Sequence, residues 1–172
     1  MAGSLIKIDE EIVSSAVSSV TLTGIDSTYD VYMLKVNNFI AATDGTDMKI
    51  RVVESGTPNS TANYDIAAKV LRSDTTFGND SNTNDTSFDC STAIGNDTGE
   101  AANWIFYIFN AYNSSEYTFF TQEMTMLSNS AVLIGRQGGC AFTSASQVEA
   151  IQMFAGSGNI DNGTFSLFGL KK

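Results

Sequence analysis

The chain has 172 residues, of which nine are Lys or Arg and nineteen are Asp or Glu, and it contains no His. The resulting formal charge of −10 repels phosphate groups, which argues against nucleic acid or an anionic membrane as a partner. The lack of imidazole excludes a His general base, a Ser–His or Cys–His pair and a His-ligated metal. Carboxylates and tyrosines remain for catalysis, but no pair of carboxylates is found that is placed to act together, and we expect a protein that is not an enzyme.

Length and composition predict one folded domain. Hydrophobic residues make up 42% of the chain, which is enough to fill a core. Charged residues make up only 16%, below the roughly 25% that is usual in soluble domains. A weakly charged surface of this kind is expected where much of it contacts other protein.

The first sixteen residues are expected to form an extended N-terminal arm. Leu5, Ile8 and Ile12 keep helical spacing, but Ile6, Ile8 and the Val/Ser run that follows suit an extended chain better. The apolar stretch is too short for a signal peptide, and no run reaches the length of a transmembrane helix. These features predict a soluble protein made in a cytoplasm.

Residues 17–172 are expected to form the folded domain. Apolar residues there alternate more often than they recur at helical spacing, which predicts strands. The expected strands lie at residues 17–22, 29–36, 48–52, 64–71, 104–109, 117–126, 131–134, 148–154 and 163–169. A set of about eight strands with little helix predicts an all-β fold, a two-sheet antiparallel β-sandwich.

Four segments carry more specific expectations. Residues 73–99 are rich in Asp, Asn, Ser, Thr and Gly and are predicted to form one long acidic surface loop. Trp104–Phe109 is apolar on both faces, which predicts a central strand buried from two sides. Gly135–Gly139 suggests a bulge or a close backbone approach. The Gly156–Gly158 turn predicts a C-terminal hairpin.

Cys90 and Cys140 lie fifty positions apart without Cys-x-x-Cys spacing, which argues against a zinc site or a redox pair. Two separate thiols in or near the core are the favoured interpretation. A disulfide formed late is the alternative.

The sequence patterns that could indicate a metal, catalytic or sugar-binding site are incomplete. Asn79–Asp85 alternates oxygen side chains as a calcium loop does, but Asp85 and Ser91 stand where an EF-hand needs Gly and Glu. Glu116 and Glu123 flank one strand on opposite faces, so they do not form a glycosidase pair. Trp104, Tyr107, Tyr112 and Tyr117 could form a sugar-stacking platform, although core packing explains most of them. We assign no catalytic, cofactor or metal residue.

Two segments resemble a known group of proteins. Residues 24–34, which contain Ser27-Thr-Tyr29-Asp-Val-Tyr32-Met-Leu34, are similar to the opening strand of small β-sandwich structural proteins of tailed bacteriophages. Residues 158–169, which contain Gly163-Thr-Phe165-Ser-Leu167-Phe168-Gly169, are similar to their closing strand. The Trp104 strand and the polar segment before it also lie where that pattern has them. The resemblance implies a jelly-roll-like sandwich and a structural role in the virion.

Within that group, the resemblance implies a capsid decoration (cement) protein on the outside of the shell, made in the host bacterial cytoplasm. The implied partners are the major capsid protein and copies of the chain itself, as a homotrimer. The arm would bury apolar side chains on these partners, namely Leu5, Ile6, Ile8, Ile12 and Val13. A tail-fibre or spike module that contacts host-surface glycan is the alternative.

Overall fold

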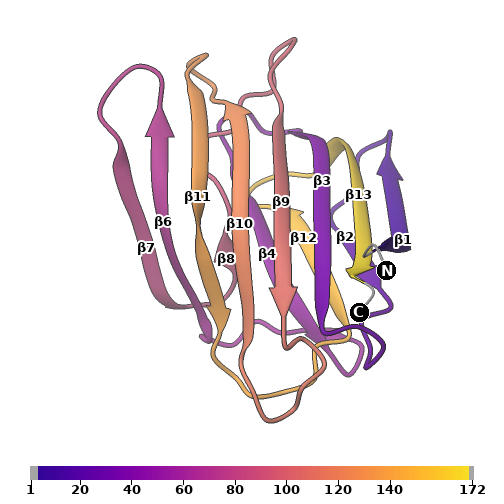
Figure 1. The fold of residues 1–172 in the computed structure, drawn as a ribbon. Coiled ribbons are helices and arrows are strands. Elements are labelled where there is room, and N and C mark those ends of the chain that lie inside the picture. The colour runs from indigo at the N-terminus through magenta and orange to yellow at the C-terminus, as the bar shows by residue number, and fades with distance from the viewer. Residues whose placement is uncertain (1–3, 171–172) are drawn as a thin grey trace.

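The computed structural model describes residues 4–170, which form an all-β sandwich of two antiparallel sheets (Figure 1). The large sheet has the order β1 (Leu5–Val13), β13 (Ile160–Leu170), β3 (Val31–Ala41), β9 (Ala102–Phe109), β10 (Thr118–Leu127), β11 (Leu133–Phe142), β6 (Tyr64–Arg72) and β7 (Gly78–Asp85). The small sheet has the order β2 (Val20–Thr23), β12 (Ala150–Ala155), β4 (Met48–Glu54) and β5 (Thr57–Pro58), and β8 (Phe88–Asp89) also pairs with β4. The predicted all-β, two-sheet sandwich is confirmed.

Alternation along the strands builds the core between the two sheets. In β4, Met48, Ile50 and Val52 are fully buried, while Lys49 and Arg51, which alternate with them, are half-buried. Side chains of alternate residues point to opposite faces of a strand, so one face of each sheet supplies the core. Trp104 on β9 is buried there, and its indole N–H donates to the carbonyl oxygen of Cys90 at 3.1 Å.

The N-terminal segment is extended as expected, but it is not a separate arm. Leu5–Val13 forms β1, an edge strand of the large sheet that pairs antiparallel with β13. The register shifts between Lys7 and Asp9, so Ile8 lies at a bulge. Residues 1–3 of the predicted arm lie outside the described residues. The predicted arm is thus part of the sandwich, because its backbone pairs with β13 and extends the large sheet by one strand.

The expectation of one long loop at residues 73–99 is wrong in part. β7 occupies Gly78–Asp85 and pairs with β6, and β8 pairs with β4. The segment that resembled a calcium loop is therefore a polar edge strand. Its side chains do not need to be apolar because an edge strand is half exposed to water.

Two further expectations are corrected by the sheet order. β12 and β13 flank the Gly156–Gly158 turn but belong to different sheets, so they do not form a hairpin. The turn carries the chain across the sandwich instead. β9 is central as predicted, but the small sheet covers only one of its faces, and Ile105 and Tyr107 are about 40% exposed on the other.

The glycines of β11 allow its backbone to lie close to that of β6, and they do not form a bulge. β11 keeps an unbroken register with both β10 and β6. A Cβ on Gly138 would overlap the carbonyl oxygen of Ala67 and lie 2.6 Å from the Ala68 Cα. A side chain at position 138 would therefore separate β11 from β6.

The two cysteines are separate buried thiols, which confirms the favoured interpretation. Burial raises the pKa of Cys140 to about 12. Burial, and then the proximity of Cys140, also raises the pKa of Cys90. Both groups are therefore protonated and unreactive at neutral pH.

Candidate functional site

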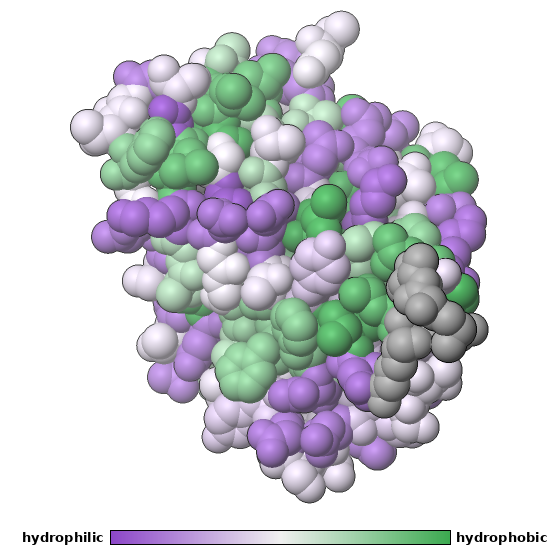
Figure 2. Space-filling view, viewed as in Figure 1, coloured by the Kyte–Doolittle hydropathy of each residue, from purple (hydrophilic) through white to green (hydrophobic). Residues whose placement is uncertain are grey.

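The candidate site is the outer face of the large sheet, the face that the small sheet leaves uncovered. Figure 2 views this face and shows apolar side chains gathered on its lower part, with hydrophilic side chains forming a band across its middle. The antiparallel register places residues from successive strands in rows that run across the sheet. Three such rows define the site.

The tyrosine row crosses the sheet at Tyr107. It is built from the paired residues Lys7, Phe168, Met33, Tyr107, Thr121, Gly139 and Ala67, in the order β1, β13, β3, β9, β10, β11 and β6. Phe168 and Met33 are large, whereas Gly139 and Ala67 on the other side of Tyr107 are small. Large side chains therefore fill the row on one side of β9, where Met33 is buried and Phe168 half-buried, and the row is hollow on the other side.

The phenylalanine row lies below it, at the end of β9. It is built from Val31, Phe109, Phe119, Ala141 and Asp65, in the order β3, β9, β10, β11 and β6. Phe119 is 44% exposed although its ring is among the largest apolar groups of the chain. Adjacent exposed aromatic and aliphatic side chains of this kind mark protein interaction surfaces.

The charged row lies above the tyrosine row. It is built from Glu10, Ser166, Lys35, Ile105, Glu123, Gln137 and Lys69, in the order β1, β13, β3, β9, β10, β11 and β6. Gln137 donates its amide N–H to Glu123 at 3.0 Å, and the Ser166 hydroxyl donates to Glu10 at 3.0 Å. The hydrogen bond from Lys7 at 3.0 Å, followed by that from Ser166, lowers the pKa of Glu10.

The three rows are electrically balanced. Their ionisable groups are Lys7, Lys35 and Lys69 on one side and Glu10, Glu123 and Asp65 on the other, three positive and three negative. Two of the nine basic residues, at 171 and 172, lie outside the described residues, so residues 4–170 hold seven basic and nineteen acidic groups. The described surface outside the rows therefore carries the whole excess of twelve negative charges, and the rows are the face on which protein packs with least repulsion.

A groove occupies the hollow side of the outer face. It has a volume of about 510 Å³ and is lined almost entirely by apolar atoms. Its floor consists of small residues on β11 and β6, namely Gly139, Ala141 and Ala67, and Phe119 and Thr121 form its wall. The groove exists because these positions lack large side chains.

The five predicted interface residues do not share one surface. Leu5 and Ile12 pair with outward-facing residues of β13 and are 52% and 68% exposed. Ile6 is also exposed, but it pairs with Gly169, which lies on the same face of β13 as the buried Leu167, so Ile6 is on the core side of the sheet. Val13 is buried in the core and Ile8 packs against it. The sequence could not separate these groups because their orientation depends on the bulge at Ile8.

The sequence did not identify the outer face, although one signal was present. Tyr107 and its neighbours make β9 apolar on both faces, which is typical of a strand covered on two sides. In the single chain only the core side is covered, so the second apolar side of β9 is available for a partner. The interpretation of Tyr107 and Tyr117 as core residues is wrong, since both are exposed, whereas Trp104 is core as expected.

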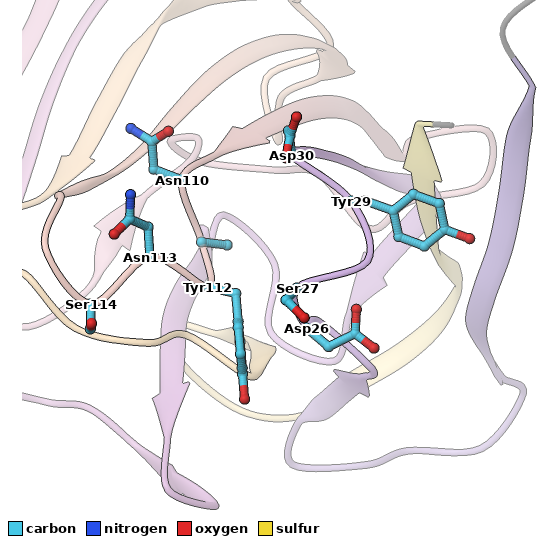
Figure 3. Close-up of a pocket in the computed structure, with 9 residues that line it drawn as sticks. Asp26, Ser27, Tyr29, Asp30, Asn110, Tyr112, Asn113 and Ser114 are labelled. Atoms are coloured by element: carbon cyan, nitrogen blue, oxygen red, sulfur yellow. The ribbon is translucent and has the colours of Figure 1, made fainter. Parts of the chain in front are cut away.

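A second hollow lies at one end of the sandwich. It has a volume of about 340 Å³ between the β2–β3 loop and the segment after β9. Figure 3 shows the Tyr112 side chain lying across from Ser27 and Asp26. The Asp26 carboxylate accepts the Thr28 amide N–H at 2.7 Å, and this bond is the main cause of its lowered pKa. The hollow therefore presents a carboxylate, a phenol and carboxamides to solvent.

The described residues hold no group of three or more Cys, Asp or Glu side chains arranged to bind a metal ion. Within residues 4–170 no helix is long and apolar enough to cross a membrane. Compared with protein-family models and with curated proteins, the sequence matches none.

Proposed function

We propose that the chain is a virion structural protein of a tailed bacteriophage, a capsid decoration protein that binds the outside of the shell and stabilises it. The observation that carries the proposal is the charge-balanced, apolar outer face of the large sheet. Such a face suits burial against protein, at roughly 25 cal/mol for each Å² of apolar surface removed from water. The resemblance of residues 24–34 and 158–169 to phage structural proteins supports the assignment to a phage virion.

The proposed partners are the major capsid protein and further copies of the chain. The excess negative charge outside the rows suits the exterior of a shell, where the chain does not face packaged DNA. Repetition on a symmetric lattice turns individually weak contacts into strong retention. In this proposal no covalent chemistry is involved, and the site acts by burial and charge matching.

The edge strand β1 supplies a second contact in this proposal, through Leu5, Ile6 and Ile12. Its bulge at Ile8 and the charges that follow it discourage pairing with a foreign strand, so contact is made by side chains. The carboxylate of Asp9 is already bound to the Thr23 amide N–H at 2.7 Å. The exposed aliphatic side chains are therefore the part of β1 left for a partner.

The test is co-sedimentation of the purified chain with undecorated shells of the virus whose genome encodes it. Saturable binding is expected, and Ile12→Asp should weaken it at least tenfold because a charge replaces the most exposed aliphatic side chain. Glu116→Lys, in an exposed loop away from the rows, is the control and should bind normally. A chain that stays in the supernatant at every concentration contradicts the proposal.

Deletion of residues 1–16 is not a suitable test. The deletion would remove β1 from the large sheet together with Val13, which belongs to the core. Loss of binding would then follow from a damaged fold. Single substitutions at exposed positions of β1 avoid this difficulty.

A second candidate function is supported by the hollow near Asp26. Its carboxylate, the Tyr112 phenol and the carboxamides of Asn110 and Asn113 are groups that bind sugar hydroxyls, as a host-binding fibre or spike module requires. A glycan array with the purified chain tests this alternative. Binding that is lost in Tyr112→Ala would favour the fibre module, and a blank array counts against it.

A further inference from the structure

We propose that the outer face of the large sheet binds a second copy of the chain, face to face, about a two-fold axis that runs along β9. The inference names the partner of the surface used in the proposed function and rests on that function only in assigning the surface to protein contact. A two-fold axis brings the same patch of both copies together. The patch must then be complementary to itself, and the charged row and the tyrosine row meet this condition.

The charged row is antisymmetric about Ile105. Lys35 lies one strand to one side of β9 and Glu123 one strand to the other. Glu10 and Lys69 lie three strands away on the corresponding sides, again with opposite charges. A two-fold axis along β9 exchanges the two sides. Each Lys35 therefore faces a Glu123, and each Glu10 faces a Lys69, of the other copy.

In the tyrosine row, large side chains on one side of Tyr107 correspond in position to small side chains on the other side. Phe168 lies two strands to one side of Tyr107, and Gly139 lies two strands to the other. Met33 and Thr121 occupy the positions in between. The same axis places Phe168 over the groove floored by Gly139 of the second copy. Close packing of large against small side chains is what stable interfaces require.

The pairs of residues that lie one strand from β9 should contribute most to the contact between the two copies. Packed sheets cross at about 30°, so each copy of β9 would be tilted by about 15° from the axis. Neighbouring strands lie about 4.8 Å apart, so facing residues one strand from the axis are offset by about 2.5 Å and those three strands away by about 7 Å. Long Lys and Glu side chains span the smaller offset easily. The pair formed by Lys35 and Glu123 is thus the decisive one to test.

The area is sufficient for a stable dimer. Eight strands of eight to eleven residues present a face on the order of 1,000 Å² at the usual strand spacing and rise. A dimer of ordinary size buries about 800 Å² on each partner. The face is also the region of the described surface on which two strongly acidic chains meet without net repulsion.

The experiment measures molar mass in solution by light scattering across a range of concentrations, with the whole chain and without shells. The wild-type chain should have twice the 18.4 kDa mass of one copy. Lys35→Glu and Glu123→Lys should each raise the dissociation constant of the dimer at least tenfold. The pair occurs twice in the dimer because of the two-fold axis, so each substitution removes two pairs. The combined exchange, K35E with E123K, should restore the dimer.

Two further variants complete the test. Gly139→Leu fills the groove and should give a monomer, and a Cβ at this position meets only the Phe120 carbonyl oxygen at 3.7 Å, so the fold should remain intact. Glu116→Lys makes the same change of charge as Glu123→Lys outside the rows and should leave the dimer unchanged. The melting temperature of each variant shows whether it is folded.

Several results would overturn the inference. These are a wild-type monomer at every concentration, a trimer, insensitivity to the single charge reversals, or failure of the combined exchange to restore pairing. A monomer that still binds shells would refute the face-to-face dimer and leave the proposed function intact. A dimer that binds no shell would refute the proposed function alone.

Discussion

The guanidinium of Arg136 on β11 contacts the carboxylate of Asp80 on β7 at 2.8 Å, beneath the sheet and across β6. Arg136 is almost fully buried, and its guanidinium also donates to the carbonyl oxygen of Asp89 at 2.7 Å. This arrangement joins the polar edge strand β7 and the short strand β8 to the middle of the large sheet. The ion pair thus helps to hold β7 on the sandwich, whereas most of the other strands are held there by apolar packing.

Replacing Asp80 by Ala should destabilise the fold by about 2–3 kcal/mol, because the buried guanidinium loses the carboxylate that compensates it. The free energy of unfolding in urea measures this loss. Asp74→Ala is the matched control, since Asp74 pairs with Arg72 at 3.0 Å on the surface and should cost at most about 1 kcal/mol. Equal losses for the two variants would show that the buried pair contributes nothing special.

Stability should fall at alkaline pH. Burial raises the pKa of Cys140 to about 12 and also raises that of Tyr64, so both groups stay protonated in the folded chain. In the unfolded chain the thiol ionises above about pH 9 and the phenol above about pH 10. The unfolded state then holds fewer protons, and the free energy of unfolding decreases as pH rises. Below pH 9 this contribution is complete.

Urea unfolding at pH 8, 9.5 and 10.5 measures the effect. Each buried group should contribute a slope of about 1.4 kcal/mol for each pH unit above its unfolded pKa. Cys140→Ala should reduce the slope by about that amount because one ionising group is removed. A slope that is unchanged in this variant would mean that Cys140 ionises equally in both states.

Part of the fold could be predicted from the sequence because alternation is a local property. Met48, Ile50 and Val52 reveal their strand whatever lies beside it. The strand order depends on distant segments, and so β12 and β13 were expected to pair although they lie in opposite sheets. β7 was missed because an edge strand held by Asp80 needs no apolar side chains.

The candidate site was beyond sequence reasoning for the same reason. Its rows join residues as distant as Lys35 and Glu123, which become neighbours only through the register of β3, β9 and β10. The apolar character of both faces of β9 was the one local sign. That pattern predicts burial on both sides within the chain, whereas the structure leaves the second side of β9 uncovered.

Trp104 should be a sensitive probe of the core, since it is the single Trp of the chain and is buried. Trp104→Phe should destabilise the fold by about 2–4 kcal/mol, because it leaves a cavity and removes the donor to the Cys90 carbonyl oxygen. Thermal unfolding followed by circular dichroism measures this. Phe106→Leu, a smaller loss on the same face of β9, should cost less, and the reverse order would contradict the importance of the indole hydrogen bond.

Gly138 and Gly139 should respond oppositely to substitution although they are adjacent in β11. An Ala at position 138 would press its Cβ into the backbone of β6, with the Ala68 Cα at 2.6 Å, and should destabilise the fold by about 2–3 kcal/mol. An Ala at position 139 points to the outer face and meets only the Phe120 carbonyl oxygen at 3.7 Å, so its effect should stay within about 0.5 kcal/mol. Urea unfolding of the two variants gives the comparison. Similar losses would mean that β11 and β6 are not held in the observed register, and the rows of the outer face would then be arranged differently.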